Sequence, residues 1–143
     1  MIVLDTNVVS EPLRPAPEGI VVDWLNRQDP QTLFLTTVSL AELLAGIEAL
    51  PAGRRRDALH AAVREQMLPL FEGRILSFDE SAAAAFARVH ASAMAAGSPI
   101  GFADGAIAAI AAARGFIVAT RNVRDFAGAG VELLNPWEQA APR

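Results

Sequence analysis

Oxygen-bearing side chains stand at four separate places in the chain, each beside a short apolar run. Asp5 follows IVL, Glu42 lies in SLAE shortly after LFLT, Asp104 lies in GFADGAIAA, and TRNVRDF contains both Asn122 and Asp125. Hard divalent cations such as Mg²⁺ and Mn²⁺ prefer oxygen ligands of this kind. A cation held there can activate a water molecule and stabilise charge on a phosphoryl oxygen. These residue types therefore fit hydrolysis of a phosphodiester bond.

Each of the first three acids also has an ordinary structural explanation. Asp5 is a good helix cap after a buried strand, and Ser39 with Glu42 has the spacing of a capping box. Asp104 suits the first turn of a helix, where the helix dipole stabilises a negative charge. However, Asp104 is the only charge in SPIGFADGAIAAIAAA, and an unpaired carboxylate on a largely buried helix is costly. We favour a functional role for Asp5 and Asp104, and for Glu42 alone the capping box.

The remaining polar candidates are less distinctive. Asn122 and Asp125 both suit a turn, so structural and functional explanations are balanced for them. Asp79, in SFDES, is expected to be a simple helix N-cap outside the site. His60 and His90 fall in the middle of predicted helices with no neighbours that suggest a catalytic triad, so we expect surface or core roles for them.

Composition limits the classes of protein that the chain can represent. With 143 residues, 52% of them hydrophobic, the chain can form one domain with a substantial core, which we place at 1–143. Cysteine is absent, which excludes disulfides and thiol sites and favours a cytoplasmic location. The apolar start lacks a basic flank, and no apolar run reaches membrane-spanning length, so we expect neither a signal peptide nor a membrane anchor.

Short apolar runs alternate with longer patterned stretches along the chain. The pattern predicts strands near 2–5, 33–36, 74–77, 116–119 and 131–134, and helices near 18–28, 39–50, 53–70, 79–96 and 101–114. Alternation of this kind is typical of an α/β fold, a three-layer α/β/α sandwich around a mostly parallel sheet. Functional groups of such sheets gather at the carboxyl ends of the strands, where the four groups of polar residues would lie.

The chain resembles the PIN domain family, and within it the VapC-like toxins of toxin–antitoxin modules, most closely their FitB-like branch. The resemblance spans nearly the whole length through MIVLDTNVVSEPLRP, TTVSLAELLAGIEAL, LPLFEGRILSFD, IGFADGAIAAIAAARG and VATRNVRDFAGAGVELLNPW. It implies a ribonuclease that depends on Mg²⁺ or Mn²⁺. The implied metal ligands are Asp5, Glu42 and Asp104.

The resemblance also assigns the remaining catalytic and supporting residues. The family's fourth acid falls on Asn122 here, with Asp125 as the nearest carboxylate, and the sequence leaves open which of the two acts. A neutral ligand weakens the expectation of a second metal ion. Thr6, Asn7 and Ser39 are implied to orient the acids or the attacking water. The candidates for contacts with RNA phosphates are Arg14, Arg121 and Arg124.

Partners follow from the same resemblance. It implies an RNA substrate, a small antitoxin, a homodimer and possibly a larger toxin–antitoxin assembly, with no membrane. The apolar faces of 39–50 and 53–70 suggest one groove for the antitoxin. The run Arg54 to Arg56 is read as a solvated helix start rather than an RNA contact.

Two alternatives belong to other classes of protein. The neutral Asn122 leaves room for a catalytically weak or inactive PIN-like module that binds RNA or an antitoxin without cleavage. A phosphate-transfer enzyme of haloacid dehalogenase type also begins with a strand that ends in Asp. That class requires a second Asp two residues later, where this chain has Asn7, so it is disfavoured.

Overall fold

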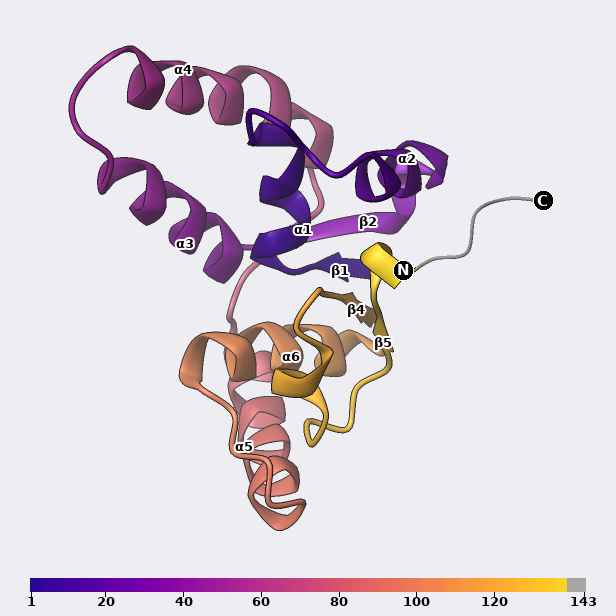
Figure 1. Ribbon diagram of the computed structural model, residues 1–143. Coiled ribbons are helices and arrows are strands. Elements are labelled where there is room, and N and C mark those ends of the chain that lie inside the picture. Colours follow the sequence, from indigo (N-terminus) through magenta and orange to yellow (C-terminus); the bar gives the residue numbers. More distant parts are fainter. Residues whose placement is uncertain (139–143) are drawn as a thin grey trace.

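Five short parallel strands lie at the centre of the computed structural model, in which residues 1–138 are described (Figure 1). In chain order they are β1 (Ile2–Leu4), β2 (Leu33–Thr36), β3 (Ile75–Leu76), β4 (Ile117–Ala119) and β5 (Leu133–Leu134). Their order in the sheet is β3-β2-β1-β4-β5, and every pair of neighbours is parallel. The first strand of the chain is therefore the central one, and the predicted parallel sheet is confirmed.

Helices cover both faces of this sheet and complete the predicted three-layer α/β fold. One side of the sheet carries α1 (Thr6–Ser10), α2 (Gly19–Arg27), α3 (Thr37–Glu48) and α4 (Arg54–Ala62), as Figure 1 shows. The opposite side carries α5 (Glu80–Ala95) and α6 (Phe102–Arg114). No helix within residues 1–138 is long and apolar enough to cross a membrane.

Successive residues of the central strands enter two separate hydrophobic cores. Val3 and Val118 pack into the core under α5 and α6, whereas Leu4 and Ala119 pack into the core under α1 to α4. A strand buried on both faces is apolar throughout and shows no alternation. This explains why continuous runs such as IVL and IVA form the strands that end at the candidate site.

Two stretches differ from the sequence prediction. The short helix α1 directly follows β1 and was not predicted. The segment 53–70, predicted as one helix, is α4 followed by a π-helical turn, η3 (Val63–Met67), and a 3-10 turn, η4 (Leu68–Phe71). Proline lacks an N–H group and clashes with the preceding helical turn, so Pro69 accounts for the break. Leu70, within this 3-10 turn, is 62% exposed.

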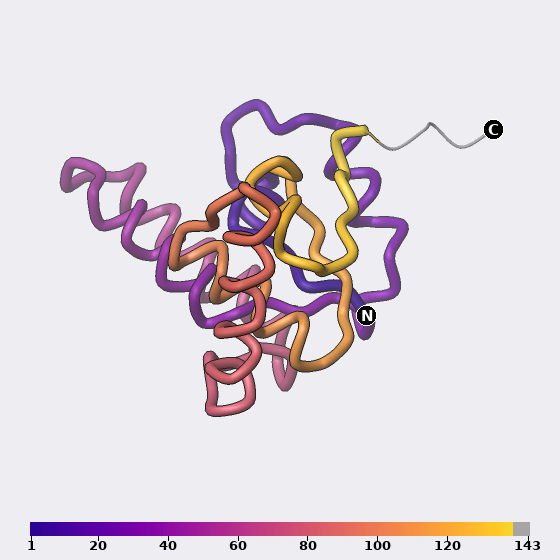
Figure 2. The backbone as a smooth tube through the Cα atoms, turned by 90° about the horizontal axis from the view of Figure 1, so that it is seen from below, coloured from indigo at the N-terminus to yellow at the C-terminus, as the bar shows by residue number. Residues whose placement is uncertain are grey.

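Helices α3 and α4 form a hairpin that projects from the rest of the molecule (Figure 2). His60 on α4 pairs with Glu48 on α3, with 2.7 Å between Nε2 and Oε1. His90 on α5 stacks on Phe86, with ring centroids 6.1 Å apart. Both histidines thus have structural neighbours, as expected.

Two glycines provide a matched test of packing. A Cβ atom at Gly128 would lie 3.0 Å from the Cα atom of Ala93 on α5, whereas a Cβ at Gly46 on α3 would meet open space. We expect Gly128→Ala to lower the free energy of unfolding by about 1–2 kcal/mol through overpacking. Gly46→Ala should raise it by about 0.5–1 kcal/mol through helix propensity. Urea denaturation measures both, and equal stability of the two variants would contradict close packing at Gly128.

Candidate active site

Asp5 lies at the carboxyl end of the central strand and is 4% exposed. Its backbone N–H donates to the carbonyl of Ala119 over 2.9 Å, so the β1–β4 pairing fixes its position. One carboxylate oxygen accepts the backbone N–H of Thr6 at 2.8 Å. The other accepts the Thr120 hydroxyl at 2.8 Å and the Asn7 amide at 3.3 Å. Asp5 therefore caps α1 and is also a buried carboxylate held from three directions.

The environment of Asp5 disfavours its charged form. Burial is the largest influence and raises the pKa of this carboxyl group above 3.8, because charge is less stable away from water. Hydrogen bonds from Thr120 and Thr6 lower the pKa in part, while repulsion from Glu42 and Asp125 raises it further. A positive partner would relieve this cost.

Glu42 reaches the site through Thr6, whose hydroxyl donates to Glu42 Oε1 at 2.7 Å. The predicted capping box is wrong. Helix α3 begins at Thr37, and its N-cap is Thr36, whose hydroxyl accepts the Ser39 N–H at 3.0 Å. Because the strand continues directly into the helix, Ser39 lies inside the first turn and Glu42 has no role in the cap. The Ser39 hydroxyl is buried and has no hydrogen-bond partner among residues 1–138.

Asp104 lies in the first turn of α6, whose N-cap is Gly101. Burial, followed by repulsion from Asp5, Asp125 and Glu42, raises the pKa of Asp104 to about 6. Each of the other three acids therefore repels the charged form of Asp104, although they come from distant parts of the chain. We call Asp5, Glu42, Asp104 and Asp125 the acidic site.

The turn after β4 supplies the fourth member of this group. Its 3-10 helix η5 (Val123–Phe126) starts after Asn122, whose carbonyl accepts the Asp125 N–H at 3.0 Å. Asp125 is exposed, yet its charge raises the pKa values of both Asp5 and Asp104. The Asn122 side chain has no hydrogen bond to a described acid. Repulsion thus connects Asp125 with Asp5 and Asp104.

Sequence reasoning missed Thr120, which directly follows β4 and is fully buried. Its hydroxyl donates to Asp5 and accepts the Asn122 N–H at 3.0 Å. A lone hydroxyl residue after the apolar run FIVA was the available signal, since polar groups at strand ends gather at one sheet edge. Asp79, by contrast, caps α5 as predicted, because its carboxylate accepts the Ala82 N–H at 2.9 Å.

The three arginines proposed for phosphate contacts differ in their surroundings. Arg14 donates to both carboxylate oxygens of the buried Glu11 at 3.3 Å, so its charge balances that acid. Arg121 and Arg124 are exposed on the turn that carries Asp125. Phosphate binding at the acidic site would therefore rely on Arg121 and Arg124 more than on Arg14.

The donor atoms suit a hydrated divalent cation. Within residues 1–138, no three Asp, Glu, His or Cys side chains lie close enough to bind one ion together. Mg²⁺ commonly keeps several waters and binds through only one or two carboxylates. The buried carboxylate of Asp5 and the three acids around it fit such an ion, with some of the acids reached through water.

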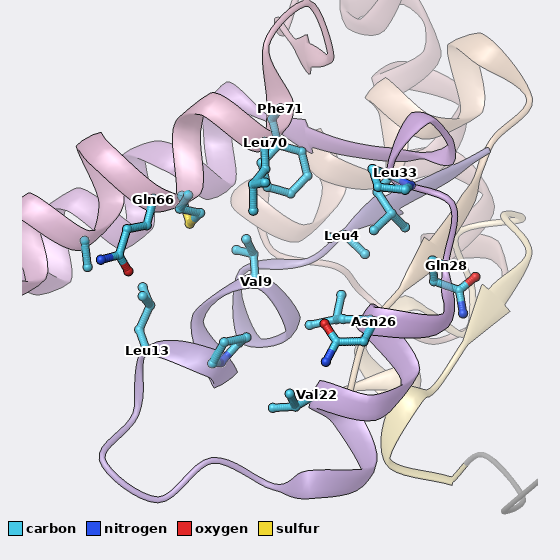
Figure 3. A pocket seen from close by; sticks show the side chains of 15 residues that line it. Leu4, Val9, Leu13, Val22, Asn26, Gln28, Leu33, Gln66, Leu70 and Phe71 are labelled. Atoms are coloured by element: carbon cyan, nitrogen blue, oxygen red, sulfur yellow. The ribbon is translucent and has the colours of Figure 1, made fainter.

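A separate apolar cleft of about 430 Å³ lies among α1, α2 and the turns after α4 (Figure 3). Its apolar lining includes Leu4, Val9, Leu13, Leu25, Met67 and Phe71. The groove predicted between 39–50 and 53–70 is not this cleft, because none of the lining residues comes from 39–50. The exposed side chain of Leu70 also lines this cleft.

The fold and the site together define a parallel α/β domain with a cluster of acids at the carboxyl edge of its sheet. The chain belongs to the PIN domain family, which matches residues 2–131. The family predicted from the sequence is thereby confirmed.

Relatives extend along nearly the whole chain. VapC ribonuclease Y4jK of Sinorhizobium fredii is 45% identical over 140 residues, covering 98% of this chain and 100% of the relative. Toxin FitB of Neisseria gonorrhoeae is 44% identical over 137 residues, covering 96% and 99%. The crystal structure of FitAcB from Neisseria gonorrhoeae matches with a TM-score of 0.93 and 44% identity, covering 97% of this chain and 100% of the other.

The burial of Asp104, together with the repulsion within the acidic site, predicts a gain in stability from Asp104→Asn. The folded protein raises the pKa of Asp104 from 3.8 to about 6, so the folded state binds this proton more tightly than the unfolded state. Ionisation therefore costs stability as the pH rises through this range. Well above pH 6 and without divalent cations, we expect Asp104→Asn to raise the free energy of unfolding by about 1–2 kcal/mol, allowing for solvent screening.

The gain should vanish below pH 3.8, where Asp104 is protonated in both states. Urea denaturation across this pH range in a chelating buffer is the measurement. Asp23→Asn, at an exposed position on α2, serves as the control and should show no such pH-dependent gain. A loss of stability in Asp104→Asn above pH 6 would contradict the repulsion.

Proposed function

We propose that this protein is the toxin of a toxin–antitoxin module and acts as a metal-dependent endoribonuclease. The observation that carries the proposal is the convergence of four acids at one site: burial, followed by repulsion from the other three acids, raises the pKa of Asp104 to about 6. Such a concentration of negative charge at the edge of a sheet destabilises the fold unless a cation binds there. The names of the relatives Y4jK and FitB support ribonuclease and toxin roles.

We assign Asp5, Glu42 and Asp104 to metal binding, directly or through bound water, with Asp125 as the fourth acid. A bound Mg²⁺ or Mn²⁺ supplies Lewis-acid stabilisation and a more acidic water. Thr6 orients Glu42, while the side chains of Asn7 and Thr120 orient Asp5 through the hydrogen bonds described above. Ser39, whose buried hydroxyl lacks a described partner, is suited to binding one of the site's waters.

The substrate and the partner occupy different surfaces in this proposal. Arg121 and Arg124 contact RNA phosphates beside the acidic site, which fixes the strand without reading its sequence. The apolar cleft between α2 and the turns after α4 suits an apolar helix of a small antitoxin. The homodimer and any larger assembly expected from the sequence stay predictions.

Cleavage should require both a divalent cation and the central acid. We expect purified protein to cleave RNA with Mg²⁺ or Mn²⁺, and chelation or Asp5→Asn to reduce cleavage at least about 100-fold, because outer as well as inner ligands contribute factors of about 10–100. Gel analysis of labelled RNA measures the products.

Asp23→Asn is the matched control, since it makes the same chemical change at an exposed position on α2, and it should cleave like the wild type. Undiminished cleavage in chelator would refute the metal-dependent mechanism. RNA binding without any cleavage at saturating Mn²⁺ would instead identify the non-cleaving PIN-like module.

The hydroxyl of Thr120 provides a finer test of the assigned geometry. Thr120→Val keeps the buried shape and removes the donor to Asp5, so the pKa of Asp5 should rise further. We expect at least about tenfold lower cleavage and a pH–rate profile shifted to higher pH. Thr120→Ser restores the donor and should recover most of the activity. An unchanged pH profile in Thr120→Val would contradict the role of this hydrogen bond.

A further inference from the structure

The side chain of Arg121 lies over the aromatic ring of Trp137, which follows later in the chain. Its guanidinium carbon is 5.1 Å from the centroid of the Trp137 ring. Trp137 belongs to the 3-10 turn η6 (Pro136–Glu138) and packs against the core under α1 to α4. The backbone N–H of Trp137 donates to Asn135 Oδ1 at 2.9 Å, which fixes the turn. The ring is thus a supported surface rather than a loose side chain.

The backbone of Arg121 is tied to the acidic site. Arg121 directly follows Thr120, and its N–H donates to Asn7 Oδ1 at 3.3 Å. The amide of the same Asn7 donates to Asp5 at 3.3 Å. The start of the Arg121 side chain is therefore fixed beside the buried carboxylate.

The charge of Arg121 is nevertheless not neutralised by the nearby acids. In the described part of the chain, its guanidinium makes no ion pair with a carboxylate. An exposed arginine next to several acids is attracted to them. Contact with the face of Trp137 provides a competing position through the cation–π interaction. A stacked guanidinium still has the N–H groups at its edge free to donate.

We propose that Trp137 is a positioning residue that holds Arg121 beside the acidic site, where its N–H groups bind a backbone phosphate of single-stranded RNA. The inference rests on the proposed function, because the phosphate belongs to the RNA strand that the acidic site cleaves. A planar guanidinium matches two phosphate oxygens at once. Trp137 thereby keeps Arg121 from occupying the acids itself and presents it at a fixed distance from them.

Binding of RNA without cleavage tests this role. The probe is a fluorescein-labelled single-stranded oligouridylate in EDTA, followed by fluorescence anisotropy over a range of salt concentrations. Loss of one phosphate contact should lower the slope of log K against log salt by about 0.7. We expect Trp137→Leu to show this change and to raise Kd roughly threefold to tenfold, as expected for the loss of one charge-assisted contact. Trp137→Phe keeps an aromatic face and should recover most of the affinity.

A double-mutant cycle separates positioning from general damage to the fold. In an Arg121→Ala background, Trp137→Leu should change neither Kd nor the salt slope. In the matched Arg124→Ala background, it should still weaken binding by its full factor. Equal loss in both backgrounds, or no loss in the wild-type background, would overturn the inference.

A variant at Arg121 avoids any change to the core. Arg121→Lys keeps the charge but lacks the planar group that stacks and binds two oxygens. It should bind the oligouridylate more weakly than the wild type, and Trp137→Phe should have no further effect in that background. Wild-type affinity in Arg121→Lys would overturn the inference, as would absence of wild-type binding at low salt.

The inference and the proposed function fail in different ways. If the wild type binds the oligouridylate but cleaves no RNA with Mn²⁺, the ribonuclease proposal fails and the role of Trp137 in binding stands. If RNA is cleaved but the cycle shows no coupling between Trp137 and Arg121, only the present inference fails.

Discussion

The burial of one carboxylate at the end of the central strand is the constraint on which the site depends. Asp5 is almost fully enclosed, and its charge is tolerated through hydrogen bonds from Thr6, Asn7 and Thr120. Those donors come from both ends of the chain and meet only because β1 pairs with β4. A change in strand pairing would remove the Thr120 hydroxyl and leave the carboxylate less stable. The order of strands in the sheet therefore determines whether the site can form.

The other acids add electrostatic repulsion to the cost of burying the Asp5 carboxylate. Burial raises the pKa values of Asp5 and Asp104, and repulsion from Glu42 and Asp125 raises both further. Two cores on opposite faces of the sheet, one around Ile107 and Ile110 and one around Leu35, supply the burial that offsets this repulsion. In the proposed function, a bound divalent cation offsets the remaining repulsion among the acids.

Local sequence patterns predicted much of the fold, and contacts between distant segments account for the misses. The run IVL is readable as a strand because both faces are buried, and Asp5 was flagged because it ends that strand. Thr120 was missed because its partner lies 115 residues away, so its position after the run FIVA did not by itself distinguish a buried hydroxyl from a turn residue. Glu42 was assigned to a cap because the sequence does not reveal that α3 starts at Thr37. Repulsion between Asp125 and acids from distant segments likewise cannot be deduced from local sequence.

One short turn carries both signs of charge that the proposed reaction requires. Asp125 acts on the acids, while Arg121 and Arg124 face solvent from the same segment. Arg14 forms an ion pair with Glu11. Of the three arginines proposed for phosphate contacts, Arg121 and Arg124 therefore remain available. Arginine side chains on this turn that were free to move would form ion pairs with the nearby carboxylates. In the inference drawn above, stacking on Trp137 keeps Arg121 away from the acids and sets the distance between the phosphate contact and the acidic site. The turn η6, which carries Trp137, thereby helps to align the RNA strand.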